Sequence, residues 1–265
     1  MKWGISVLGL AIAGLVFARA AAAQFATPQI GESENGAQKI KFIESGKPLS
    51  DMKWTITRTT QNGKPVIKKE LTGEWFKDGA GPITWKEESV FELADGTIRT
   101  LSWHKQSSGA EKETFQYDFD WTTRKLHAYY FDGVSGKKKD KTVSLEGDVI
   151  WGDAAELMIR GFPFEKGAGS KYTAKIMLEP NIIVSGQIVH RGEETIDTPF
   201  GKLPCYKLEM KATGAAAIVV PKTYYWVTKK APHVQVLKES KENGPLDPRT
   251  INALVEYAPA EWVKP

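Results

Sequence analysis

The chain contains 265 residues, of which 41% are hydrophobic and 26% are charged, and 36 Lys and Arg side chains nearly balance 32 Asp and Glu side chains. These values are ordinary for a globular protein and exclude a highly charged, disordered chain. The single cysteine, Cys205, excludes an intramolecular disulfide framework and is expected to be a small buried side chain.

The first residues have the pattern of a secretory signal peptide. Lys2 precedes an apolar run from Ile5 to Phe17, and a series of alanines ends at Ala23. The run is shorter than the roughly 20 residues that a bilayer span requires, so we expect cleavage near Ala23 and a periplasmic or secreted chain without a transmembrane span. Removal of Lys2 and Arg19 would leave 34 basic against 32 acidic side chains. This near-neutral balance argues against nucleic-acid binding.

Four segments are expected along the chain. Residues 1–23 form the signal peptide, and residues 24–50 are polar with scattered glycine and proline, which predicts an irregular N-terminal segment. Residues 51–245 are predicted to form a β-rich domain, in which two lobes could meet near residues 150–169. Residues 246–265, which include Pro248 and Pro259, are predicted to form an irregular tail.

Alternation of apolar and polar residues predicts many short strands. The alternation starts at Met52 and is interrupted by hairpin signals at Asn62-Gly63 and Asp95-Gly96. The clearest strand runs from Phe115 to Trp121, because its aromatic residues occupy one face and its polar residues the other. A further strand is expected from Leu126 to Phe131. The lysine run at 137–141 is predicted to be a solvated hairpin tip.

One internal stretch has helical spacing. Asp153 can cap a short helix that contains Leu157 and Met158 and ends before Gly161 and Pro163. More than ten short strands with one short central helix predict a mostly β protein. Because a flat sheet of this size would leave an unburied face, we expect one or more curved antiparallel sheets, arranged as a half-barrel, a barrel or two packed sheets.

The segment from Glu156 to Met210 resembles a family of exported bacterial proteins of unknown function, DUF3108. The resemblance rests on two sequence segments, ELMIRGFPFEKGAGSKYTAKIM and RGEETIDTPFGKLPCYKLEM, and on a closing hairpin, YYWVTKKAPHVQVLKES. The matching positions are Arg160, Pro163, Gly167, Tyr172, Thr198, Pro199, Gly201, Cys205 and Tyr206. The resemblance implies an exported β-rich protein without known catalytic residues. Its architecture is similar to that of periplasmic lipoprotein carriers (LolA and LolB), in which a curved sheet surrounds helical elements.

Residue types that carry chemistry are scattered along the chain. The four histidines show no metal-ligand spacing, no nucleophile motif surrounds a serine or Cys205, and EKGAGSK lacks the context of a phosphate loop. We therefore expect no catalytic residues, no metal and no cofactor. An envelope hydrolase is the weaker alternative, and its site would gather Asp118, Asp120, His127 and His233 from neighbouring strands.

The aromatic content is the feature that points to a function. The chain has 9 Trp, 8 Tyr and 11 Phe residues, more than one thin sheet interior requires. These side chains could fill a core, line a hollow for a lipid or another hydrophobic molecule, or form a surface for a polysaccharide or an envelope protein. The favoured hypothesis is a non-catalytic protein with a concave aromatic surface. Its predicted ligand-binding residues are Phe115, Tyr117, Phe119, Trp121 and Trp226, with Trp85 and Trp103 behind them.

Overall fold

The computed structural model describes residues 25–76, 79, 81–94, 97–145, 147–180, 182–241 and 245–264. The predicted signal peptide lies outside the described residues. The described part contains fifteen strands: β1 (Ser33–Phe42), β2 (Pro48–Gln61), β3 (Lys64–Trp75), β4 (Ile83–Ala94), β5 (Thr97–Gly109), β6 (Glu113–Asp120), β7 (Lys125–Asp132), β8 (Lys138–Ser144), β9 (Val149–Trp151), β10 (Lys171–Glu179), β11 (Ile182–Thr198), β12 (Gly201–Ala212), β13 (Thr223–Thr228), β14 (Gln235–Lys241) and β15 (Arg249–Ala258). It also contains one α-helix, α1 (Asp153–Met158), and four 3-10 turns: η1 (Ile159–Gly161), η2 (Phe164–Lys166), η3 (Gly214–Ile218) and η4 (Ala260–Val263).

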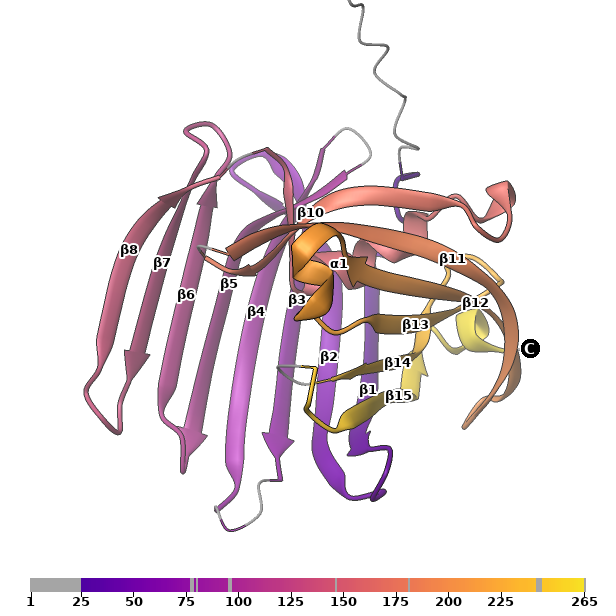
Figure 1. Cartoon of the computed structure of the whole chain (residues 1–265), viewed down its shortest axis with the longest axis horizontal. Coiled ribbons are helices and arrows are strands. Elements are labelled where there is room, and N and C mark those ends of the chain that lie inside the picture. Colours follow the sequence, from indigo (N-terminus) through magenta and orange to yellow (C-terminus); the bar gives the residue numbers. More distant parts are fainter. Residues whose placement is uncertain are drawn as a thin grey trace, which may run out of the picture.

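The fifteen strands form a single sheet in the order β8-β7-β6-β5-β4-β3-β2-β1-β15-β14-β13-β12-β11-β10-β9. Two meanders, β1–β8 and β9–β15, are therefore joined where the first strand pairs with the last. All pairings are antiparallel except β9 with β10, which are parallel because α1, η1 and η2 lie between them in the chain. The sheet curls until β9 and α1 contact β5, and the C-terminal half crosses in front of the N-terminal half (Figure 1).

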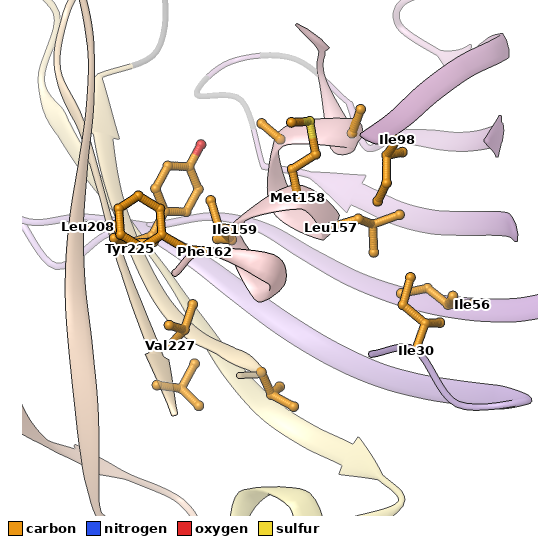
Figure 2. Close-up of a cluster of buried hydrophobic side chains, with 14 of the residues drawn as sticks. Ile30, Ile56, Ile98, Leu157, Met158, Ile159, Phe162, Leu208, Tyr225 and Val227 are labelled. Atoms are coloured by element: carbon orange, nitrogen blue, oxygen red, sulfur yellow. The ribbon is translucent and has the colours of Figure 1, made fainter. Parts of the chain in front are cut away.

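The α1–η1 segment lies between the two halves of the sheet and contributes side chains to both. Figure 2 shows Leu157 directed toward Ile98 of the N-terminal half, while Ile159 and Phe162 lie beside Tyr225 of the C-terminal half. All five of these side chains are buried in the larger of two hydrophobic clusters. The short helix is thus held by tertiary packing, since six residues are too few for a stable isolated helix.

A second, smaller cluster joins the β6–β8 end of the sheet to the β9–β11 end. Tyr117, Phe119 and Leu126 come from the first end, and Val149 and Met177 come from the second. β9 contributes to both clusters, because Ile150 points into the larger one while Val149 points into the smaller one. The curled shape therefore buries both faces of one edge of the sheet.

Most of the predicted fold is confirmed. The protein is mostly β, with one large curved sheet that is antiparallel apart from the β9–β10 pair, and one short helix. The turn at Asn62 and Gly63 connects β2 with β3, and both residues have positive φ, 51° and 76°. β6 exposes Gln116, Asp118 and Asp120 on one face, as predicted. No helix in the ranges described above is long and apolar enough to cross a bilayer.

Both predicted irregular segments contain a strand. β1 lies within residues 24–50 and β15 lies within residues 246–265, and the two strands pair with each other. In β1 the glycine that suggested irregularity is required by packing, because a Cβ atom on Gly36 would lie 2.6 Å from the Trp54 ring. The prediction of irregular structure at these positions was therefore wrong.

Two local predictions also differ from the structure. Gly152, and not Asp153, is the N-cap residue of α1, and no side chain caps the helix. Asp153 instead lies in the first turn, where its carboxylate pairs with Lys69 at 2.9 Å. The lysine run lies mainly on β8 rather than at a hairpin tip. Lysines suit that position because β8 is an edge strand, where charges oppose pairing with another chain.

Candidate functional site

Five of the seven predicted ligand-binding residues lie together. Phe115, Tyr117 and Phe119 of β6, Trp103 of β5 and Trp121 after β6 belong to the second hydrophobic cluster. The ring centroids of Trp103 and Tyr117 are 5.0 Å apart, and those of Phe119 and Trp121 are 5.9 Å apart. Tyr117 and Phe119 are buried, whereas the other three rings are half-buried. The five residues thus form one packed cluster with a partly accessible margin.

The other two predicted residues lie elsewhere. Trp85 is half-buried and packs against the larger cluster, and the Lys105 ammonium group lies 5.4 Å from its ring centroid. Trp226 is buried in the larger cluster, on β13 of the C-terminal half. Its indole nitrogen donates a hydrogen bond to Glu194 at 2.6 Å. The structure therefore does not bring Trp85 and Trp226 into one surface with the β6 aromatics, and their role in binding stays a prediction.

Charged side chains occupy the space beside α1. The Lys69 ammonium group, on β3, lies 2.9 Å from Asp153 and 3.0 Å from Glu156 of the helix, and Lys238 of β14 lies 3.2 Å from Glu156. Burial opposes the charge on Glu156, but the two lysines outweigh it and lower its pKa to about 2. Glu87 of β4 shows the opposite shift, because burial and the nearby Asp153 raise its pKa to about 8.

A second buried ion pair joins β1 to η1. Both carboxylate oxygens of Glu34 accept hydrogen bonds from the Arg160 guanidinium, at 3.0 and 2.8 Å. Tyr257 donates its hydroxyl to the same carboxylate at 2.8 Å, and the Gly31 amide donates to it at 2.8 Å. Glu34 is fully buried, so these bonds replace the water that it would have in the unfolded chain. Arg160 is one of the family-like residues of the sequence, and its role here is structural.

The opposite face of the N-terminal half carries a long open groove of about 1080 Å³. Adjacent residues of a strand point to opposite faces, and Leu71 of β3 packs in the larger cluster beside α1, so its neighbour Thr72 points away from the helix. Thr72 pairs with Lys53 and Lys86, and the row continues through Gln106 and Thr114. We call this feature the outer groove. Its lining includes Ala37, Gln38, Lys39, Asp51, Met52, Lys53, Thr72, Glu74, Thr84, Trp85, Lys86, Gln106, Ser108, Lys112, Thr114, Phe131, Val255 and Glu256, so one predicted ligand-binding residue, Trp85, lines this groove.

The groove crosses eight neighbouring strands, from β15 through β1 to β7. Strands lie about 4.8 Å apart, so the row of side chains is about 35 Å long. Its lining combines hydroxyl, amide and charged groups with apolar side chains such as those of Met52 and Trp85. Thr84 and Ser108 share a hydrogen bond at 2.6 Å, and Lys39 lies 3.9 Å from Asp51. At one end the Phe131 ring is 36% exposed. The groove can therefore hydrogen-bond an elongated polar molecule and stack against one of its rings.

Three of the residues considered for a hydrolase, Asp118, Asp120 and His127, lie on the β6–β7 pair, whereas His233 lies apart from them. Asp118 pairs across the strands with His127, but its carboxylate bonds His104 at 3.0 Å, whereas His127 bonds Asp140 at 2.9 Å. Asp120 accepts hydrogen bonds from the turn after β6, which lower its pKa. His233 lies in the C-terminal half beside the Phe164 ring. Over the described ranges, no group of three His, Cys, Asp or Glu side chains could hold a metal ion.

Cys205 is fully buried, as predicted. Burial, with the nearby charge of Glu194, raises the pKa of its thiol to about 12. A thiol with this pKa carries almost no thiolate at neutral pH, and thiolate is the nucleophilic form. Cys205 is therefore a packing residue of β12.

The outer groove was not predicted from the sequence. Apart from Trp85, which was among the predicted ligand-binding residues, most of its residues are polar positions of alternating sequence patterns, which in a single sequence look like ordinary solvent-facing side chains. Register was the missing information, since the groove exists only when these positions align across eight strands. The Asn62-Gly63 turn is the one local signal that could have supplied part of it, because a two-residue hairpin turn fixes which β2 and β3 residues face each other.

Comparison with known proteins decides the family. A family model described as "Protein of unknown function (DUF3108)" matches residues 39–243, most of the chain. The chain belongs to the DUF3108 family. The match extends well beyond the segment on which the sequence resemblance rested, and it includes β2–β8. Among curated proteins, none matches this DUF3108 chain.

One solved structure supports the fold. A β-barrel-like protein from Brucella abortus, of the domain family DUF1849, matches with a TM-score of 0.51 and 9% identity over 85% of this chain and 96% of that chain. An exported protein with a YmcC-like fold from Bacteroides fragilis has a TM-score of 0.38 and 10% identity, over 88% of this chain and 99% of that chain. A lipoprotein from Parabacteroides distasonis has a TM-score of 0.34 and 14% identity, over 88% and 98%. The first of these shows a shared barrel-like fold for the DUF3108 protein.

Proposed function

We propose that this DUF3108 protein is an exported, non-catalytic binding protein of the bacterial envelope, and that it holds an elongated glycan strand in the outer groove. The observation that carries the proposal is the position and size of the groove, about 1080 Å³ across eight strands. By contrast, a cavity beside Lys69 and Glu156, next to α1, measures about 20 Å³. A polymer therefore has room on the outer face, where it can enter from solvent.

The chemistry of the groove suits sugar units. Glycans present hydroxyl groups that accept and donate hydrogen bonds, and Thr72, Gln106 and Thr114 offer the matching groups in one row. The exposed Phe131 ring can stack on the apolar face of a sugar ring. Long lysine stems, such as those of Lys53 and Lys86, add apolar contact while their ammonium groups reach acidic substituents. Export is supported by the signal-peptide pattern that ends near Ala23.

A second candidate is a lipid-like or other hydrophobic ligand on the second cluster, the hypothesis that the sequence favoured. The observation in its favour is that Trp103, Phe115 and Trp121 stay half-buried although they adjoin buried aromatic rings. A ligand that covered these rings would gain about 25 cal/mol per Å² of apolar surface, before ordering costs. An envelope protein that docks on the same rings would gain binding free energy by the same burial of apolar surface.

Native mass spectrometry separates the two ligands. The full chain is expressed in an envelope-bearing host, the mature protein is purified from the envelope, and its mass is measured before and after addition of soluble glycan fragments or of acyl lipid. The proposal predicts added masses that correspond to glycan fragments, with longer fragments bound more tightly because more strands contribute contacts. Retention of acyl lipid with no glycan adduct would contradict it and favour the second candidate.

A further inference from the structure

Two neighbouring loops of the C-terminal half expose aliphatic side chains. The η3 turn, between β12 and β13, leaves Ile218 80% exposed and the next residue, Val219, 61% exposed. In the β14–β15 connection Leu246 is 96% exposed. The loops lie side by side, because Ile218 of one and Pro245 of the other line the same pocket of about 290 Å³. We call Ile218, Val219 and Leu246 the apolar loop pair.

The apolar loop pair does not serve the core. No residue of η3 is buried, and its sequence GAAAI continues into Val219 and Val220 without a polar side chain. Turns of soluble proteins normally use Gly, Pro, Asn, Asp and Ser, because their tips face water. Three large aliphatic side chains on two adjacent loops therefore mark a surface that is covered when the protein works.

Cations flank the same loops. Lys222 and Lys241 line the pocket with the apolar side chains, together with Arg249 and a single carboxylate, Glu239. Glu239 and the more distant Glu44 both bond Arg249, at 3.2 and 3.0 Å. The two lysines are thus left to carry positive charge beside the apolar loop pair.

A nearby carboxylate on β12, Glu209, does not neutralise the positive charge of the two lysines. Glu209 is only 4% exposed and accepts two hydrogen bonds from Arg191, and Lys222 approaches it only to 4.0 Å. Lys211 lies 3.6 Å from the same carboxylate, so three cations share one buried negative charge. Among the described residues of this surface, Asp247, in the loop beside Leu246, is the remaining carboxylate, and there the cations outnumber the carboxylates; Glu242 of the same connection lies outside the described residues.

We propose that the apolar loop pair docks on the surface of an anionic lipid bilayer, with Ile218, Val219 and Leu246 inserted at the acyl boundary and Lys222 and Lys241 against the headgroups. Aliphatic tips flanked by lysines match the two parts of such a surface, since the side chains gain by burial and the ammonium groups are attracted to acidic lipids. A bilayer with acidic headgroups also matches the charge of this surface, because Lys222 and Lys241 stand beside the exposed aliphatic side chains and its described cations outnumber its carboxylates. The proposal does not depend on the glycan site, whose lining lies mainly on β1–β7 and shares no residue with the pocket between the two loops.

Environment-sensitive fluorescence tests the docking directly. Cys205 is buried, so an Ala217→Cys variant of the mature chain places a single reactive thiol for an NBD probe in η3. With vesicles of equal parts phosphatidylcholine and phosphatidylglycerol, we expect a blue shift and a gain in NBD emission. Pure phosphatidylcholine vesicles should give a much smaller change. A matched Val134→Cys variant, on the exposed β7–β8 turn, should give no change with either vesicle.

Substitutions test which side chains carry the binding. Ile218→Asp with Leu246→Asp should lower vesicle partitioning by about tenfold or more, and Lys222→Gln with Lys241→Gln should lower it by about tenfold and remove most of its salt dependence. Val134→Asp is the control, because Val134 is also 67% exposed. Circular dichroism verifies that the variants fold, as expected for exposed positions.

Three outcomes would overturn the proposal. The wild-type protein could fail to sediment with anionic vesicles, or the Ile218→Asp/Leu246→Asp variant could bind vesicles as well as the Val134→Asp variant. Third, the wild type could form a dimer that Ile218→Asp dissociates, while neither protein binds lipid. The last result would assign the surface to a second copy of the chain.

Discussion

Buried charges beside α1 hold the helix between the two halves of the sheet. Lys69 and Lys238 reach Glu156 from β3 and β14, so the helix is tied to strands of both halves. Their mutual attraction raises the pKa of both lysines and lowers that of Glu156, which keeps all three charged at neutral pH. Removal of one partner would leave an unpaired charge in a nonpolar space, which is far more costly than loss of a surface pair.

Substitution of Glu34 tests how much the buried Glu34–Arg160 ion pair contributes to stability. Glu34→Gln should lower the free energy of unfolding by about 3–5 kcal/mol, because Arg160 would remain buried without its counter-charge. Urea denaturation measures the change. Glu44→Gln, which removes the exposed partner of Arg249, is the matched control and should leave stability nearly unchanged. A comparable loss in both variants would show that burial of Glu34 does not matter.

The raised pKa of Glu87 leads to a prediction of how the free energy of unfolding depends on pH. Its pKa is raised from the ordinary 4.5 to about 8 by burial and by Asp153, so the folded protein keeps a proton that the unfolded chain releases above pH 4.5. Raising the pH through this window therefore favours the unfolded chain. Glu87→Gln should be more stable than the wild type at pH 8 by at least about 1 kcal/mol and nearly equal at pH 5. Urea denaturation at both pH values measures this difference. A constant difference between the two proteins over this range would refute the assignment.

Individual strands set the register on which the groove depends. The Asn62-Gly63 turn adopts positive φ at both residues, and from it β2 and β3 pair without interruption to Ser50 and Trp75. Other strand pairs are less regular: β4 and β5 shift register between Val90 and Phe91, and the first and last strands, β1 and β15, shift between Ala37 and Gln38. Such bulges re-aim side chains and bend strands, which helps the sheet to curl.

The contribution of the Asn62-Gly63 turn to stability can be tested by adding one methyl group at Gly63. Gly63→Ala should lower the free energy of unfolding by about 1–2 kcal/mol, because an L residue is strained at a φ of 76°. Gly81→Ala is the control, since a Cβ atom there would meet open space and Gly81 has no positive φ. Thermal unfolding of the two variants measures the difference. Equal melting temperatures would mean that the turn does not constrain the hairpin.

The sequence predicted elements better than their arrangement. Alternation from Phe115 to Asp120 is strong enough to define the β6 faces, and Asn62-Gly63 defines one hairpin. β1 escaped prediction because Gly36 makes room for Trp54, a long-range contact that a local pattern does not contain. β15 escaped because Asn252 interrupts its apolar face, where its amide donates to Gln38 of β1. In both strands a residue that is unusual for a strand contacts a residue far away in the sequence: Gly36 lies against Trp54, and Asn252 bonds Gln38.

For the same reason the predicted aromatic surface was only partly brought together: five of its seven residues form one cluster, and Trp85 and Trp226 do not join it. Phe115, Tyr117 and Phe119 lie on β6, so their common face follows from the period of two, and Trp121 follows directly after the strand. Whether Trp85 and Trp226 join them depends on the curl of the sheet, and the structure places them against the larger cluster. The bulge between Val90 and Phe91 also makes the pairing of Lys86 with Gln106 unpredictable from the Asp95-Gly96 signal alone.

At the scale of the whole molecule, one curled sheet has two different faces. The inner face is filled by α1, η1 and two hydrophobic clusters, whereas the outer face of β1–β7 is polar and grooved. The joint between β1 and β15 makes both halves one continuous sheet, so contacts in one half support the other. The inner face holds the buried core, and we propose that the outer groove binds a glycan and that the apolar loop pair docks on a bilayer.

The most direct test of the central claim is a binding titration by isothermal calorimetry with soluble envelope glycan fragments, using three proteins. Thr72→Trp fills the middle of the outer groove, and Thr142→Trp adds the same bulk to the exposed face of β8, outside the groove. We predict that the wild type and Thr142→Trp bind glycan alike and that Thr72→Trp loses at least about tenfold in affinity. Unchanged binding by Thr72→Trp would contradict the assignment of the groove.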